Sequence, residues 1–164
     1  MQEDNNVILQ YPTLCGEISQ KEMNNLYEFY AGRFSEMTSI TTYLYQSIIT
    51  SGMEISYLLK ELAICEMSHL EALAKAILYY GGDPLFAGKY NYYSCSYVNY
   101  CKDVREFLQT DIEWEVNAYK EYKECALKSN NASFSQLMTR FSLDEELHVS
   151  RLRSAYFKLF NEEV

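Results

Sequence analysis

The sequence predicts an all-α protein, a four-helix bundle built from two similar helix pairs with a long crossover between the second and third helices. Two Glu-x-x-His motifs end at His69 and His148, which are 79 residues apart. The same shift carries Glu36 onto Glu115, which indicates that one helix pair occurs twice. A tyrosine-rich stretch without helical periodicity, residues 84–102, separates the two pairs and supplies the crossover.

Composition limits the class of protein. The 164 residues suit one domain with a substantial core. We divide the chain into an N-terminal extension, 1–23, and a helical domain, 24–160. No apolar run approaches the ~20 residues of a membrane span, and we expect no signal peptide. The net charge of −9 argues against nucleic acid as a partner. This acidic excess serves either solubility or the collection of metal cations.

The cysteines point to a reducing compartment. There are five, an odd number, and none forms a C-x-x-C pair. A structural zinc site or a rubredoxin-type iron site is therefore not expected. Reduced thiols are the simpler interpretation, and they predict a cytoplasmic protein.

The first helix pair precedes the crossover. Apolar residues at helical spacing predict one helix over about 24–50, ended by Ser51-Gly52. A second helix is expected over 54–80. Gly81-Gly82-Asp83-Pro84 ends it, because glycine provides a left-handed cap and proline cannot continue the helix.

The second pair follows the crossover. A connection this long inside a compact domain needs a purpose, which is either to span the bundle's length or to form a β-ribbon or a dimer contact with its tyrosines. Asp103 is expected to cap a third helix that runs to about residue 128. Asn130-Asn131 makes the next turn, and Ser133 is the expected cap of a fourth helix.

The two motifs have the spacing of metal ligands. Residues three apart on a helix share a face, about 5–6 Å apart at Cβ, so each motif presents a carboxylate and an imidazole to one point. These residues lie among core positions, where four unpaired carboxylates would each cost several kcal/mol. Two divalent cations would balance the four negative charges. The candidate metal ligands are Glu36, Glu66, His69, Glu115, Glu145 and His148.

This ligand set resembles that of the ferritin-like di-metal carboxylate superfamily, in which two helices each supply a Glu and two each supply a Glu-x-x-His. Two sequence motifs are most similar to those of the rubrerythrin, manganese catalase and bacterioferritin branches. They are Glu-Met-x-His-Leu-Glu at 66–71 and Asp-Glu-Glu-x-His at 144–148. The resemblance covers about residues 24–160. It implies two Fe or two Mn ions per chain, with Glu66 and Glu145 as the bridging pair.

Further residues are candidates for supporting the ligands. Tyr43 and Tyr122 lie two turns beyond Glu36 and Glu115 and either donate hydrogen bonds to ligand carboxylates or are plain core aromatics. Asp144 resembles the carboxylate that orients a histidine ring in related sites. The residue that corresponds to it in the first repeat is Cys65, so the two metal positions are expected to differ.

One departure from the family pattern bears on the branch. Rubrerythrins carry a further Glu one turn after the third-helix ligand, and this chain has Ala118 there. The departure favours a more symmetric site, like that of bacterioferritin or manganese catalase.

The predicted function is that of an oxidoreductase acting on hydrogen peroxide or O₂, either a rubrerythrin-like peroxidase with an external electron donor or a manganese-catalase-like enzyme. No catalytic residue beyond the metal ligands is predicted. The alternatives are a ferroxidase or iron-binding ferritin-like protein, and a metal-free helical interaction module. A homo-oligomer, as a dimer or other small assembly, is expected in preference to a cage.

Overall fold

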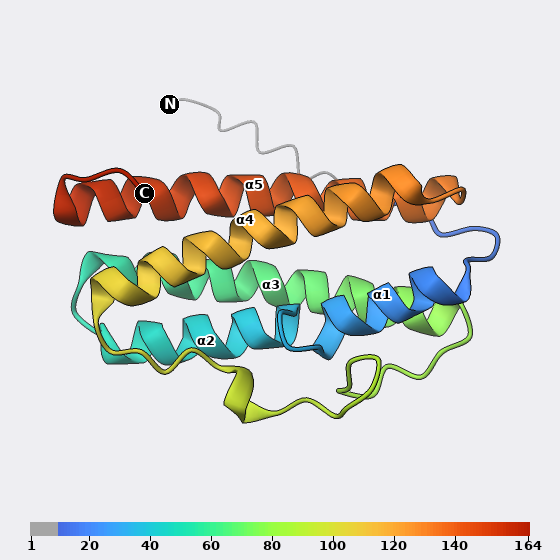
Figure 1. Cartoon of the computed structure of the whole chain (residues 1–164), viewed down its shortest axis with the longest axis horizontal. Coiled ribbons are helices and arrows are strands. Elements are labelled where there is room, and N and C mark those ends of the chain that lie inside the picture. The colour runs from blue at the N-terminus through green and yellow to red at the C-terminus, as the bar shows by residue number, and fades with distance from the viewer. Residues whose placement is uncertain (1–9) are drawn as a thin grey trace.

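The computed structural model describes residues 10–164 and shows the predicted all-α bundle (Figure 1). Helices α1 and α2 follow one another along one side of the bundle and together take the place of a single helix (Figure 1). The fold class predicted from the sequence is therefore confirmed. The elements are α1 (Gln20–Ala31), α2 (Glu36–Ile49), α3 (Glu54–Tyr79), the 3-10 turn η1 (Cys95–Tyr97), α4 (Val104–Lys128) and α5 (Ala132–Phe160).

The single first helix predicted over about 24–50 is wrong, because the chain breaks it between α1 and α2. Gly32, a poor helix former, ends α1. Ser35 then caps α2 by accepting a hydrogen bond from the backbone N–H of Thr38 at 3.3 Å. The break makes Glu36 the first residue of α2.

The other helices keep close to their expected limits. The helix predicted over 54–80 is α3, and Asp103 caps α4 as expected. The prediction that Ser133 caps α5 is wrong, since Asn131 caps that helix. The Ser133 hydroxyl instead accepts a hydrogen bond from the backbone N–H of Cys15 at 2.9 Å, which ties the N-terminal segment to α5.

Two apolar clusters form the core, one toward each end of the bundle. One contains Leu73 and Phe141, and the other contains Leu59 and Leu152. Each fully buried side chain of this kind stabilises the fold by about 1.5–3 kcal/mol. Because α3 and α5 contribute to both clusters, the middle of each helix lies between them. That middle section holds the polar residues of the predicted site.

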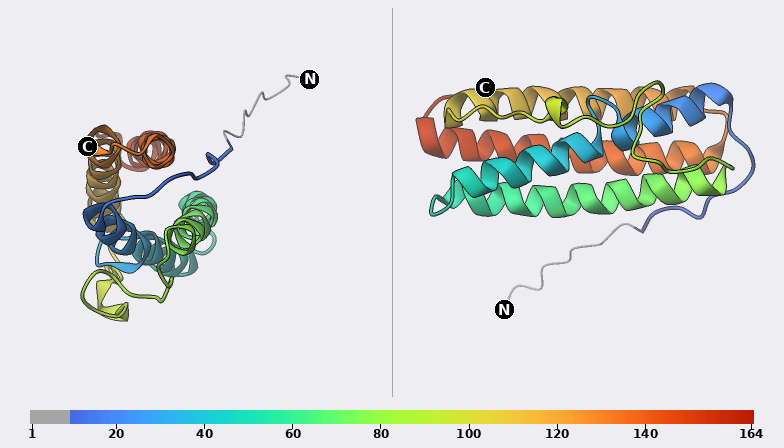
Figure 2. Two further views of the ribbon diagram at one scale, coloured as in Figure 1. Left: turned by 90° about the vertical axis from the view of Figure 1, so that its right-hand side faces the viewer. Right: turned by 90° about the horizontal axis from the view of Figure 1, so that it is seen from below.

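The crossover runs along the outer side of α1 and α2 (Figures 1 and 2). The Tyr93 hydroxyl lies 2.7 Å from the Thr41 hydroxyl, and the backbone N–H of Asn99 donates to Thr42 at 3.2 Å. Within the described residues an isolated bridge between Ala87 and Tyr92 is its one β-type contact. The crossover thus spans the length of the bundle.

The search for membrane spans, made over residues 10–164, finds no helix long and apolar enough to cross a bilayer. The division into an extension (1–23) and a helical domain (24–160) remains a proposal. Helix α1 begins at Gln20, and residues 1–9 lie outside the described part of the chain.

Candidate metal centre

Six buried side chains converge between the two apolar clusters, and they are the six predicted as ligands. None is more than 4% exposed. Each group below offers donor atoms that lie within 4.8 Å of one another. The two groups are Glu36, Glu66, His69 and Glu145, and Glu66, Glu115, Glu145 and His148.

The two shared carboxylates face both histidines. Glu66 places one oxygen 2.8 Å from Nδ1 of His69 and the other 2.9 Å from Nδ1 of His148. Glu145 does the same from α5, at 3.2 Å and 3.0 Å. Each carboxylate therefore offers one oxygen to each of two adjacent positions, which is the arrangement of a bridging ligand.

The other two carboxylates each serve one position. Glu36 Oε2 lies 3.6 Å from Nδ1 of His69, and Glu115 Oε2 lies 3.5 Å from Nδ1 of His148. The two imidazole rings stack with their centroids 5.9 Å apart. The result is a nearly symmetric pair of positions, one from each repeat.

Several inward-facing atoms lack a hydrogen bond of acceptable geometry. They are both carboxylate oxygens of Glu66, Nδ1 of His69 and Oε1 of Glu145. A buried polar atom left without a partner costs about 1–3 kcal/mol, and more when it is charged. Two divalent cations would satisfy these atoms and neutralise the four carboxylates, so the donor set fits a dinuclear metal centre.

The carboxylates of the centre raise the pKa of both histidines. Burial opposes a charged imidazole, but the carboxylates Glu36 and Glu66 raise the pKa of His69 well above its usual value. Against the same burial, Glu66 and Glu145 raise the pKa of His148. Metal ions would have to displace the imidazole protons from the nitrogens that bind the metal.

The carboxylates separate into two kinds. Burial and the charge of Glu66 raise the pKa of Glu36 well above its usual value, and burial and the charge of Glu145 do the same for Glu115. Burial acts against the charged form of Glu66 too, but His148 and His69 hold its pKa well below the usual range. The surroundings therefore favour the ionised form of the shared Glu66 and the protonated form of the two outer carboxylates.

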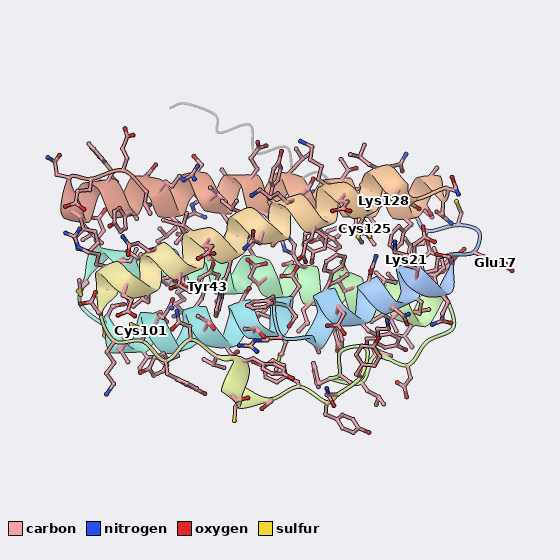
Figure 3. The ribbon with its side chains drawn as sticks, in the orientation of Figure 1. Glu17, Lys21, Tyr43, Cys101, Cys125 and Lys128 are labelled. Atoms are coloured by element: carbon pink, nitrogen blue, oxygen red, sulfur yellow. The ribbon has the colours of Figure 1, made fainter. Side chains whose placement is uncertain are left out.

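The two tyrosines cross between the helix pairs. Tyr43 on α2 donates to Glu115 on α4, and Tyr122 on α4 donates to Glu36 on α2. Figure 3 shows Tyr43 pointing into the space between these helices. Each tyrosine thus restrains a carboxylate of the opposite pair.

The histidine rings also contact two residues outside the group of six, Asp144 and Cys65. Asp144 Oδ2 lies 3.0 Å from Nε2 of His69 and also pairs with Arg140. Its counterpart Cys65 is a thiol, 3.9 Å from Nε2 of His69. Burial would raise the pKa of Cys65, but hydrogen bonds to His148 and His69 lower it to about 7. The His69 ring therefore has both a carboxylate and a thiol behind it, and the same thiol also hydrogen-bonds to His148.

Sequence reasoning missed one buried acid near the centre. Asp111 lies one turn before Glu115 on α4, is 1% exposed and accepts a hydrogen bond from Gln46 at 3.1 Å. Burial raises its pKa to about 8, against the effect of the Gln46 hydrogen bond. Its spacing of four from Glu115, on the same helix face, was the available signal.

Comparison with known proteins supports the architecture. Neither a protein-family model nor a curated protein matches the sequence. Solved structures do match. KatB, a manganese catalase from Anabaena PCC7120, has a TM-score of 0.83 at 24% identity, over 97% of this chain and 81% of KatB. A mycobacterial bacterioferritin has a TM-score of 0.73 at 20% identity, over 89% of this chain and 88% of its own.

A third structure, bacterioferritin from Rhodobacter capsulatus with a metal-free dinuclear site, also has a TM-score of 0.73 at 20% identity. The match covers 89% of this chain and 89% of that one. At these identities the likeness concerns the fold. The chain therefore has the ferritin-like fold, which is the fold that its motifs led us to expect.

Proposed function

We propose that the chain binds two manganese or two iron ions at the six converging residues and acts as an oxidoreductase on hydrogen peroxide or O₂. The supporting observation is that Glu66 and Glu145 each offer one oxygen to either histidine, while four of the donor atoms at the centre lack a hydrogen bond. Mixed carboxylate and imidazole ligands suit Fe or Mn. Such a pair of ions would supply two-electron redox chemistry and Lewis acidity.

The surrounding residues have defined tasks in this proposal. Glu36 and Glu115 would each hold one ion, with the tyrosine hydroxyls of the opposite helix pair restraining them. The apolar clusters close the centre toward both ends of the bundle. Asp144 would keep the His69 ring oriented with Nδ1 toward the centre.

Within this class we favour disproportionation of hydrogen peroxide, in which two H₂O₂ give two H₂O and one O₂. The reaction balances without an external electron donor. Two observations support it. Ala118 replaces the additional glutamate of rubrerythrins, and the KatB structure, which is a manganese catalase, matches 97% of the chain. Peroxide reduction by a rubrerythrin-like route would instead need an external donor of two electrons.

Iron oxidation and binding is the second candidate. Its support is the match to bacterioferritin structures over 89% of the chain. A cytoplasmic location, suggested by the five free cysteines, and a homo-oligomer of small size complete the proposal.

The deciding experiment is elemental analysis of protein produced with both iron and manganese available, followed by addition of H₂O₂ with an oxygen electrode. Two manganese ions per chain and release of one O₂ per two H₂O₂ would support the catalase reaction. Two iron ions with peroxide consumed and no O₂ released would favour the peroxidase or ferroxidase. Protein that takes up neither metal would refute the proposal.

A further inference from the structure

A cavity leads from the protein surface to the carboxylate side of the candidate centre. Its volume is about 230 Å³, and it lies between the start of α2 and the middle of α4. Its inner wall includes the buried carboxylates Glu36, Glu115 and Glu145. Its outer wall includes Phe34, which is 61% exposed and belongs to the break between α1 and α2. The cavity therefore connects solvent to the centre.

The helical spacing explains why the space exists on this side. On α3 and α5, the residue three positions after each shared glutamate is a histidine. On α2 and α4, the residue three positions after Glu36 and Glu115 is small, Ser39 and Ala118 respectively. Both small residues line the cavity, and the two histidines do not. The centre is thus closed by imidazoles on one side and open between two small residues on the other.

The charges around the cavity limit what enters it. Among the described residues that line it are Glu113 and Glu121 near the surface, and no lysine or arginine. A cleft lined by one sign of charge repels ligands of that sign. About 30 Å³ is the share of one water molecule in the liquid, so the cavity has room for several molecules of that size.

We infer that this cavity is the binding site for the oxidant, and that Ser39 and Ala118 keep it open to small neutral molecules such as H₂O₂ or O₂ in preference to anions. The inference rests on the proposed function and specifies its substrate site. A larger side chain at position 118 would fill the space beside Glu115 without removing any metal ligand.

The test is Ala118→Leu in the Mn²⁺-loaded protein, with Ala155→Leu as the matched control. Ala155 is also a partly buried alanine within a long helix, but it does not line this cavity. Elemental analysis should give the same manganese content in both variants and the wild type. The relaxivity of water protons, which reports access of water to Mn²⁺, should fall in Ala118→Leu alone. The kcat/KM of Ala118→Leu for H₂O₂ should fall on the order of tenfold or more. A tenfold loss corresponds to about 1.4 kcal/mol in barrier height.

Two further variants keep the test decisive if leucine at 118 prevents folding. Ser39→Leu should produce the same loss from the opposite wall. Glu113→Lys combined with Glu121→Lys should strengthen inhibition by azide, an anion, while leaving manganese content unchanged.

Equal relaxivity and equal peroxide turnover in Ala118→Leu and the wild type would overturn the inference, even if the enzyme is a catalase. Conversely, the wild type could lack peroxide activity while the Ala118→Leu variant shows reduced access of water to Mn²⁺. That result would refute the proposed reaction and retain the cavity as the route to the metals.

Discussion

Replacing Glu66 with alanine tests the shared-ligand geometry most directly. Glu66 is 1% exposed and contributes one oxygen to each position, at 2.8 Å from His69 Nδ1 and 2.9 Å from His148 Nδ1. Its loss should therefore weaken both metal positions together. The matched control is Glu71→Ala on the same helix, since Glu71 is exposed and pairs with Lys75 at the surface.

The expected size follows from linkage. With free metal at about 100 times the Kd, each site stabilises the folded protein by ~2.7 kcal/mol, so two sites give ~5.4 kcal/mol. For a chain of this size about 1 kcal/mol moves Tm by ~2–4 °C, so saturation with metal should raise Tm by roughly 10–20 °C. The rise should be nearly abolished in Glu66→Ala and intact in Glu71→Ala.

The assay is thermal unfolding by circular dichroism with and without Mn²⁺, together with metal content by native mass spectrometry. The quantity compared between variants is the rise in Tm that metal causes. A change in the stability of the metal-free variant therefore does not affect the comparison. If Glu66→Ala retains two ions and the full rise in Tm, then Glu66 does not bridge and the site assignment fails.

Four further results are expected. Because the raised pKa values of His69 and His148 favour protonated imidazoles, metal affinity should increase with pH, and calorimetry in buffers of different ionisation enthalpy should detect proton release. Asp144→Asn should weaken the metal position at His69 about 10–100-fold in a metal titration, and equal weakening of both positions would contradict a role for Asp144 through the His69 ring. Tyr122→Phe removes the buried hydrogen bond to Glu36 and should cost about 1–3 kcal/mol in urea unfolding without loss of metal stoichiometry. Light scattering should give the mass of a dimer or other small assembly, and a monomer at micromolar concentration would refute that part of the proposal.

Much of the site follows from spacing along the chain. A helix repeats every 3.6 residues, so Glu66 and His69 share a face whatever surrounds them. The 79-residue repeat adds the corresponding residues of the other half. Local side-chain chemistry likewise predicts the Asp103 cap of α4, because it depends on residues next to one another in the chain.

The break between α1 and α2 shows where such reasoning stops. Apolar spacing continues from α1 into α2, and a single Gly32 inside a helical pattern is often tolerated. The chain breaks there because Ser35 caps α2 and the Thr38 hydroxyl donates to the carbonyl of Gly32 at 3.3 Å. These contacts stabilise a turn that competes with the continuous helix.

The sequence by itself determined the helical class, the paired organisation and the six residues that meet at the centre, because these depend on helical period and repetition. Only the tertiary structure decided which residues contact which candidate ligand. Asp144 contacts the histidine of α3 and not the one on its own helix, and Tyr43 donates to a carboxylate on α4. The cavity beside Ala118 was decided in the same way. Such contacts between helices depend on how far each helix is displaced and rotated against its neighbour, which no spacing within a single helix encodes.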